Sequence, residues 1–178
     1  MGTAKDDPML GFDERPLSTR QVGSFCIDPY EFPNRKGGMP LVNMTWPAAK
    51  AACEQLGKRL CEEDEWEKAC KGAGSLRYPY GENYEASACN TEDEYGEDRA
   101  LSASGRFVRC RSGYGVFDLS GNAAEWTATA YAGGADKAQK GGSFDRPDYA
   151  GRCAARKNAA PTVRGVEVGF RCCADVKP

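Results

Sequence analysis

The stretch from Gly115 to Trp126, GVFDLSGNAAEW, concentrates residues whose types and spacing could do chemistry. Asp118 and Glu125 supply carboxylate oxygens, and Gly121 permits a sharp turn that directs neighbouring backbone carbonyls inward. Oxygen atoms of these kinds are the ligands that calcium prefers in proteins. The same spacing also suits a polar turn between two strands, with Asp118 in an Asx turn and Glu125 in solvent. The residues alone leave both interpretations open.

Two features of the composition limit the chemistry: the chain has nine cysteines and no histidine. The absence of histidine excludes Ser-His-Asp and Cys-His catalysis, and metal sites that need imidazole ligands. No C-x-x-C pair occurs, which disfavours zinc ribbons and thioredoxin-like motifs. Scattered cysteines are typical of a disulfide-rich domain, so we expect an extracytoplasmic protein that is secreted, periplasmic or on the cell surface.

The charge and length point to a single domain without a nucleic-acid partner. The net charge is -2 with both signs mixed, which argues against a nucleic-acid or polybasic membrane surface. No window is apolar enough to span a bilayer, and no signal peptide is visible. We place one domain at 22–178, after an extended or disordered lead-in at 1–21. The chain could belong to a larger exported protein or lipoprotein.

The elements that would position these residues are few and short. The segment 45–57 predicts a helix, with Thr45 as N-cap, Pro47 in the first turn and Gly57 as its stop. A second helix is predicted from about Glu62 to Lys71. Acids crowd its N-terminus, where the helix dipole favours negative charge. The apolar residues of 73–115 show neither helical nor strand periodicity, which predicts a long loop. A loop of this length usually carries function or is held by metals or disulfides. Strands are predicted at 24–28, 125–128, 138–144, 152–157 and 168–174, which gives an α+β domain.

Seven motifs follow one another along the chain. They are GKRL at 57–60, EDEWE at 63–67, YPYG at 78–81, GVFDLSGNAAEW at 115–126, GGS at 141–143, RCAAR at 152–156 and GFRC at 169–172. Together they resemble the formylglycine-generating enzyme, or sulfatase-modifying factor, family over roughly residues 25–173. The resemblance implies that family's variant of the C-type lectin fold, with two helices, short antiparallel strands and much irregular loop.

For the loop at 115–126, the resemblance implies a structural calcium site. Its ligands would be two carboxylates and two backbone carbonyls, those of Asp118, Glu125, Gly121 and Ala123. A second site in the family begins at an asparagine, which looks like Asn90 with the Thr91 carbonyl. Its closing acid would be Asp93 or Asp98, or is absent because the loop differs in length.

The catalytic part of the family pattern is missing. The resemblance implies two cysteines after the Gly-Gly-Ser motif that hold copper and oxidise a cysteine of a sulfatase peptide. After Ser143 this chain reads FDRPDYAGR, so Arg146 stands where the first cysteine would be, and the segment is shorter around the second. Arginine cannot replace a thiolate, and Ala124 replaces an aromatic residue of the enzymes. We therefore expect no copper, no catalytic residue and no formylglycine generation. The family's iron-dependent sulfoxide synthases are excluded because they need histidine.

The resemblance also implies two structural disulfides, Cys53 with Cys172 and Cys70 with Cys153. Cys172 and Cys173 are adjacent in a predicted strand, so their side chains point to opposite faces and need different partners.

The remaining cysteines leave alternatives open. We pair Cys173 with Cys26 on the first strand, and Cys89 with Cys110 across the long irregular region. Cys61 is then left over, as an inert buried thiol rather than a redox or metal site. The alternative pairs Cys26 with Cys61 and frees Cys173.

These observations lead to a hypothesis of function. We expect a non-catalytic, exported, calcium-stabilised module that binds an unknown protein, peptide or small ligand in the family's groove. Its contact residues would mix aromatic and charged side chains, at Trp126, Ser143, Asp145, Arg146, Asp148, Tyr149 and Arg152. The plain alternative is that these side chains only solvate the loop. Two other functions stay open: a copper-independent enzyme that uses Ser143 and Arg146, and a hypervariable lectin-fold display protein.

Overall fold

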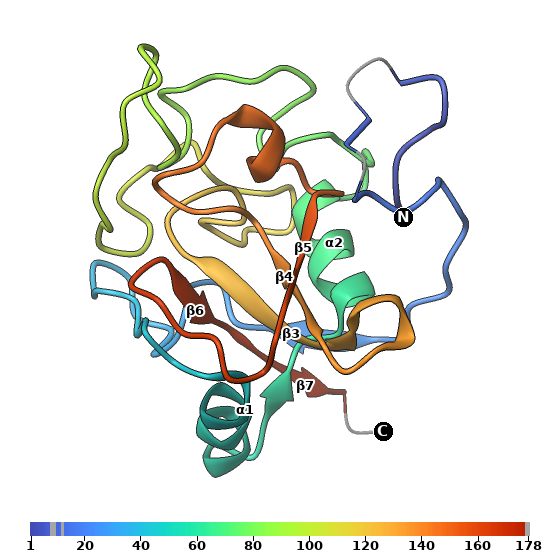
Figure 1. The fold of residues 1–178 in the computed structure, drawn as a ribbon, viewed down its shortest axis with the longest axis vertical. Coiled ribbons are helices and arrows are strands. Elements are labelled where there is room, and N and C mark those ends of the chain that lie inside the picture. Colours follow the sequence, from blue (N-terminus) through green and yellow to red (C-terminus); the bar gives the residue numbers. More distant parts are fainter. Residues whose placement is uncertain (8–9, 12, 177–178) are drawn as a thin grey trace.

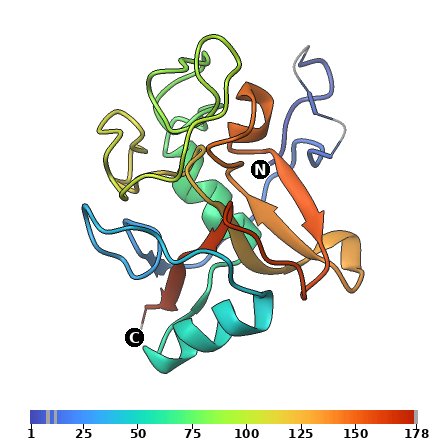
Figure 2. The same ribbon diagram turned by 60° about the vertical axis from the view of Figure 1, so that its left-hand side comes forward.

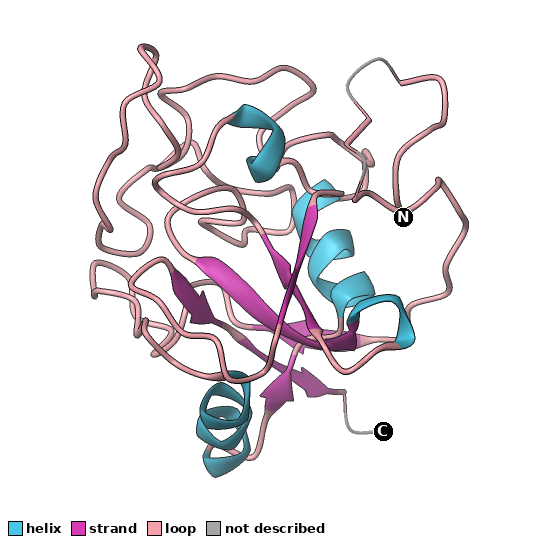
Figure 3. Ribbon diagram, in the orientation of Figure 1, coloured by secondary structure: helices cyan, strands magenta, loops and turns pink. Residues whose placement is uncertain are grey.

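The computed structural model describes residues 1–7, 10–11 and 13–176, and these form an α+β domain, as predicted (Figure 1). Its two α-helices are α1 (Trp46–Gln55) and α2 (Glu63–Lys71). Irregular loops connect most of the short elements and dominate the part of the molecule far from α1 (Figure 3). In the described part of the chain, no helix has both the length and the apolar character that a bilayer crossing needs.

The strands form two small sheets (Figure 2). One is antiparallel, and its strands are, in order, β1 (Phe25–Ile27), β7 (Cys172–Asp175) and β2 (Arg59–Leu60). The other is mixed, with a parallel β3–β6 pair, and its strands are, in order, β5 (Arg156–Ala159), β4 (Lys137–Lys140), β3 (Ala124–Ala130) and β6 (Val168–Phe170). The chain leaves one sheet and enters the other at Arg171, which separates β6 from β7.

Both predicted helices are confirmed, and each begins or ends within two residues of its predicted bounds. Thr45 has extended backbone angles and precedes α1, and Gly57 adopts a positive φ of 67° just beyond its end. The N-terminus of α2 is held by the carboxylate of Glu65, which accepts the backbone N–H of Glu62 at 2.8 Å. The Thr45 side chain makes no capping hydrogen bond, so the glycine stop of α1 and the acidic N-terminus of α2 are the local signals that the structure retains.

Three predicted strands are corrected by the structure. The strand predicted at 138–144 ends at Lys140, because Gly141 and Gly142 take φ angles of 92° and 65° that no strand contains. The strand predicted at 152–157 begins only at Arg156, after a turn in which the N–H of Ala155 donates to the Arg152 carbonyl. The strand predicted at 168–174 is two strands in different sheets. The two-residue strand β2 was not predicted at all.

Buried side chains form two core clusters. The first includes residues of α1, β3 and β6, among them Trp126 and Phe170. The second surrounds Trp66 of α2 and includes Leu119. The loop at 115–126 thus runs from one cluster to the other, which fixes both of its ends.

Three of the predicted disulfides are confirmed. Their bonds join Cys53 to Cys172, Cys70 to Cys153 and Cys89 to Cys110. The last bond closes the long irregular region, and the other two tie the helices to the later part of the chain. Each is expected to restrict the unfolded chain.

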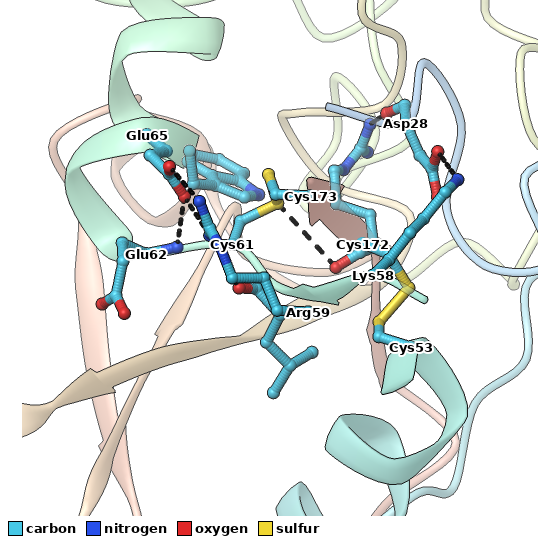
Figure 4. Close-up of a disulfide and its surroundings, with 12 residues drawn as sticks. Asp28, Cys53, Lys58, Arg59, Cys61, Glu62, Glu65, Cys172 and Cys173 are labelled. Atoms are coloured by element: carbon cyan, nitrogen blue, oxygen red, sulfur yellow. Dashed lines mark hydrogen bonds and ion pairs between the residues drawn. A yellow bond between two sulfur atoms is a disulfide. The ribbon is translucent and has the colours of Figure 1, made fainter. Parts of the chain in front are cut away.

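The predicted pair of Cys26 with Cys173 is wrong, and so is the alternative of Cys26 with Cys61. Cys173 is bonded to Cys61, with their Cα atoms 4.8 Å apart (Figure 4). Cys26 is opposite Ala174 in the β1–β7 register, so it faces away from Cys173. Cys61 instead lies two residues beyond Arg59, the register partner of Cys173, and hence on the same face. The unpaired cysteine is therefore the exposed Cys26, not a buried thiol.

The described residues of the lead-in pack against α2. The N–H of Gly2 donates to Glu67 at 2.6 Å, and Lys71 donates to the Gly2 carbonyl at 2.7 Å. The guanidinium of Arg15 donates to Asp64 at 2.5 Å and to Glu67 at 3.1 Å. The described residues of the lead-in contain no helix, yet they are anchored by ionic contacts with buried acids that the polar sequence did not indicate.

These contacts predict an acid-sensitive stability. Burial alone would raise the pKa of Glu67, but the charges of Lys140, Lys71 and Arg15, with the hydrogen bond from Gly2, lower it to about 2. A lowered pKa gives stability above the ordinary value of 4.5, and that stability is lost as the pH falls toward 2. Between about pH 5 and pH 3, we expect the free energy of unfolding of the wild type to fall by about 2 kcal/mol from this group.

Urea unfolding at both pH values measures this loss. A Glu67→Gln variant should show a flatter pH dependence, whereas Glu54→Gln, at an exposed ion pair with Lys50, should keep the wild-type slope. Equal slopes in the wild type and Glu67→Gln would contradict the assignment.

Candidate functional site

A cavity of about 250 Å³ lies where the lead-in meets β4, β5 and the turns that follow Gly141. Four of the seven predicted groove residues line it: Ser143, Arg146, Tyr149 and Arg152. Ala124, at the position where the resemblance implies an aromatic residue, lines it too. The structure therefore brings most of the predicted groove to one place.

The other three predicted groove residues do not line the cavity. Trp126 is buried in the first core cluster, where its indole N–H donates to the Met44 carbonyl at 2.9 Å, so the structure places it apart from the cavity. Asp145 accepts the Ser143 hydroxyl at 2.5 Å, and Asp148 accepts the N–H of Tyr149 at 2.7 Å. These two acids shape the loop rather than face the cavity.

Two glycines position this wall of the cavity. Gly141 and Gly142 both have positive φ, and a Cβ on Gly142 would lie 2.8 Å from the Ala150 carbonyl oxygen. Only glycine fits such a close backbone approach. The tight turn lets the segment carrying Arg146 fold back as a short 3₁₀ helix at Asp148–Gly151.

The cavity wall is rich in cations. Five basic residues line it, against the two acids Asp13 and Glu167, and they are Lys140, Arg146, Arg152, Arg156 and Lys157. Two of these cations form ion pairs with acids that do not line the cavity. Arg152 lies 2.6 Å from Glu14 of the lead-in, and Arg156 lies 2.8 Å from Glu63 of α2.

Lys140 is the most enclosed of these cations. It is fully buried, and its Nζ lies 3.8 Å from Glu63 and 3.7 Å from Glu67, beyond hydrogen-bond distance. Burial lowers the pKa of Lys140, and these two carboxylates oppose that effect. The Nζ of Lys140 has no hydrogen-bond partner.

The loop at 115–126 lies in the core, where Glu125 is neutralised by an arginine. The Arg171 guanidinium donates to both Glu125 oxygens, at 2.7 Å and 2.6 Å, and the Trp66 indole N–H donates at 2.7 Å. Glu125 and Arg171 are fully buried. Sequence reasoning placed Arg171 in a motif but missed its role as the partner of Glu125.

Further buried acids surround this pair. Asp118, at a positive φ of 57°, accepts the N–H of Gly105 at 2.6 Å. The Asn122 amide donates to both oxygens of Glu31 at 2.9 Å. Burial and the charges of Asp118 and Glu125 raise the pKa of Glu31 to about 8, and burial raises the pKa of Asp118 to about 6.

The predicted ligand Glu125 of the first calcium site fits this arrangement poorly. Both oxygens of Glu125 already accept hydrogen bonds, and the adjacent Arg171 charge opposes a second cation. At the second predicted site, the Asn90 amide nitrogen donates to the Ala100 carbonyl at 3.0 Å and to Asn122 at 2.9 Å. The neighbouring Thr91 hydroxyl lies 2.8 Å from the hydroxyl of Tyr84. Within the described ranges, no three acidic or cysteine side chains are arranged to hold a metal ion.

The cavity has no thiol in its wall. Eight of the nine cysteines form the four disulfides, and the unpaired Cys26 lies on β1 outside the cavity lining. The segment at 144–152 contains no cysteine. Two thiolates therefore cannot converge here on one metal ion in the described structure.

Known proteins of the same pattern include an enzyme and a relative named as inactive. Residues 28–176 match the model of the sulfatase-modifying factor enzyme 1-like domain. The chain is 32% identical over 171 residues to the formylglycine-generating enzyme of Bos taurus, an alignment that covers 78% of this chain and 45% of the enzyme. It is 32% identical over 151 residues to the inactive C-alpha-formylglycine-generating enzyme 2 of Mus musculus, covering 75% and 48% of the two chains. The chain thus spans about half the length of these relatives.

A solved structure shares the fold over nearly the whole chain. PvdO from Pseudomonas aeruginosa superposes with a TM-score of 0.83, covering 99% of this chain and 90% of that one. The sequence identity is 23%, so this likeness concerns the fold.

Proposed function

The chain belongs to the family of sulfatase-modifying factor enzyme 1-like domains, and from that premise we propose that it is a non-catalytic member that binds a ligand in its cavity. One observation carries the proposal: the segment after Ser143 contributes Arg146 and Arg152 to the cavity, and no thiol. The copper chemistry that the resemblance implies for the enzymes needs two thiolates at this place. Here the same wall offers cationic donors instead.

Family membership alone does not decide between catalysis and binding. One relative is named as a formylglycine-generating enzyme and another as an inactive one. The difference has to lie in the site. Arginine stays protonated and cannot serve as a thiolate ligand, which supports the non-catalytic alternative.

A copper-independent enzyme is the second candidate, because the Ser143 hydroxyl lies 2.5 Å from the Asp145 carboxylate. Asp145 also lies 3.7 Å from the Arg146 guanidinium. A carboxylate is nevertheless a weak base for a serine hydroxyl, and nucleophilic serines usually rely on a stronger one. Ser143 is also 2% exposed, which leaves little room for attack on a substrate.

The disulfides support an extracytoplasmic location for this binding domain. Four disulfide bonds persist only where the surroundings are oxidising. We therefore place the proposed ligand outside the cytoplasm, in the periplasm, at the cell surface or in the medium.

A ligand screen with paired variants tests the proposal. Small molecules and peptides are screened by thermal shift against the wild type, Arg146→Ala and Tyr149→Ala, whose side chains lie at the cavity. Arg109→Ala and Tyr95→Ala, at exposed positions outside the cavity lining, are the matched controls. We expect ligands whose shift is lost in the cavity variants and kept in the controls. If both cavity variants bind everything as the wild type does, the proposed site is wrong.

Calcium stabilisation through Asp118 and Glu125 is what the family resemblance implies, and it would require Glu125 to release Arg171. A ligand that binds only the folded state raises the melting temperature as its concentration rises. After EDTA treatment, a rise with CaCl2 but not with MgCl2 would establish the calcium site. The contacts of Glu125 lead us to expect no such rise, with Arg171 as the permanent counter-ion.

A further inference from the structure

We propose that the ligand of the cavity is a small organic anion, with a carboxylate or phosphate group attached to an apolar body. This inference rests on the proposed function, because it names the class of ligand for the same cavity. Its main support is that several polar atoms of the lining residues have no hydrogen-bond partner.

The wall residues hold polar atoms that lack partners, and all of these atoms are donors. The buried nitrogens without a hydrogen bond on lining residues are Gln139 Nε2, Lys140 Nζ, Arg152 Nη1 and Arg156 Nε. No lining residue in the described part of the chain has a buried acceptor oxygen in that state. Lys140 Nζ already faces Glu63 and Glu67 of α2, so it is not counted as a donor for a ligand. Buried donors without partners are costly, and a ligand that brings acceptor oxygens would satisfy those of Gln139, Arg152 and Arg156.

The existing ion pairs leave the arginines with capacity for a ligand. A guanidinium carries five N–H donors in a planar fork. Arg152 uses Nη2 toward Glu14 and Nε toward the Tyr149 carbonyl, while Nη1 is unused. Arg156 uses Nη2 toward Glu63, while Nε is unused. A carboxylate or phosphate oxygen is the acceptor that such a fork prefers.

Arg152 is fixed close to the cavity wall. It is 2% exposed, and a Cβ on Gly11, another lining residue, would lie 3.0 Å from its Nη2. Gly11 and Asp13 of the lead-in therefore line one side of the cavity, and Glu14 pairs with Arg152. A donor that is held in place in this way loses little entropy on binding.

The rest of the wall suits an apolar body. Small or apolar side chains line the cavity, namely Ala124, Ala150, Ala155 and Val168. The exposed Tyr149 ring lies at the same wall and can cover an aromatic or aliphatic group. A volume of about 250 Å³ accommodates a compound built on one aromatic ring rather than a folded peptide.

Four probes that share one ring but differ in charge test the inference. Benzoate, phenyl phosphate, benzamide and benzylamine are titrated into the full chain by calorimetry. At least one anion is expected to bind about tenfold more tightly than benzamide, and benzylamine more weakly still. Comparison of benzoate with phenyl phosphate tells which anion the wall prefers.

A double variant tests the role of the arginine. Glu14→Gln with Arg152→Gln removes both buried charges together, so that neither is left unpaired, and circular dichroism confirms that it folds. We expect a tenfold or greater loss of anion affinity with benzamide affinity unchanged. Arg109→Gln, at an exposed ion pair, is the matched control and should bind as the wild type does.

Each outcome separates this inference from the proposed function. Anions that bind no better than benzamide, or no probe binding at all, overturn the anion assignment. If benzamide or benzylamine then binds in a way that depends on Tyr149, the cavity remains a binding site for another class of ligand. Anion binding that survives Arg146→Ala, Tyr149→Ala and the double variant overturns the proposed site as well.

Discussion

Replacing Arg171 with methionine is expected to destabilise the domain by about 3 to 5 kcal/mol, because it leaves the Glu125 carboxylate buried without its partner. The guanidinium is fully buried and donates to Glu125 at 2.6 and 2.7 Å. It also donates to the Asp28 carbonyl at 3.1 Å and to the Phe117 carbonyl at 2.8 Å, so several groups lose their donor together. Urea unfolding measures the effect.

Two further variants separate this ion pair from general damage to the core. A double variant, Glu125→Gln with Arg171→Met, should be more stable than Arg171→Met alone, because no buried charge is left uncompensated. Lys50→Met, at the exposed pair with Glu54, should change stability by less than about 0.5 kcal/mol. A double variant less stable than Arg171→Met would contradict the assigned role of the pair.

Removal of the disulfide between Cys61 and Cys173 has the second large expected effect. The bond joins residues separated by 112 positions, so it strongly restricts the unfolded chain. The double variant Cys61→Ala with Cys173→Ala should lose about 2 to 5 kcal/mol in free energy of unfolding. Denaturant unfolding under non-reducing conditions measures this loss.

Cys26 is the control for that experiment, because it is exposed and unpaired. Cys26→Ser should stay within about 0.5 kcal/mol of the wild type. Alkylation of the unfolded, non-reduced protein should label Cys26 and leave Cys61 and Cys173 unlabelled. If Cys26→Ser were as damaging as the double variant, the cysteine pairing described here would be wrong.

Local chemistry explains which elements the sequence could predict. Gly57 marks the end of α1 through a positive φ that glycine favours, whereas Thr45 precedes the helix in an ordinary extended conformation. The strand predicted across Gly141 and Gly142 is wrong because the backbone turns at these two residues, which both have a positive φ. A glycine pair inside a predicted strand is the signal that could have indicated the turn.

The cysteine pairing needed information that the sequence does not contain. The pairing of Cys173 depends on the register of β7 against both of its neighbours. The strand β2 that brings Cys61 into place is two residues long, too short to show any period. The pairs implied by the family resemblance were confirmed because they did not depend on this register.

Some residues of the candidate site could likewise be predicted from the sequence, and others could not. Ser143, Arg146 and Tyr149 were predicted from one continuous segment, and the structure keeps them together. Trp126 lies on the same strand as Ala124, yet its side chain packs in the first core cluster, which the motif did not indicate. The contribution of Glu14 could not be predicted, because an isolated acid in a polar lead-in carries no sign of a buried partner.

The central claim is that this domain keeps the family scaffold and binds a ligand without oxidising cysteine. Aerobic incubation of the full chain with copper and a Cys-x-Pro-x-Arg peptide tests it most directly, with mass spectrometry as the readout for the aldehyde and an active family member as the positive control. We predict no more aldehyde than in the reaction without protein. Aldehyde that accumulates in proportion to the protein would contradict the account, because it would show that copper chemistry proceeds without the two thiolates.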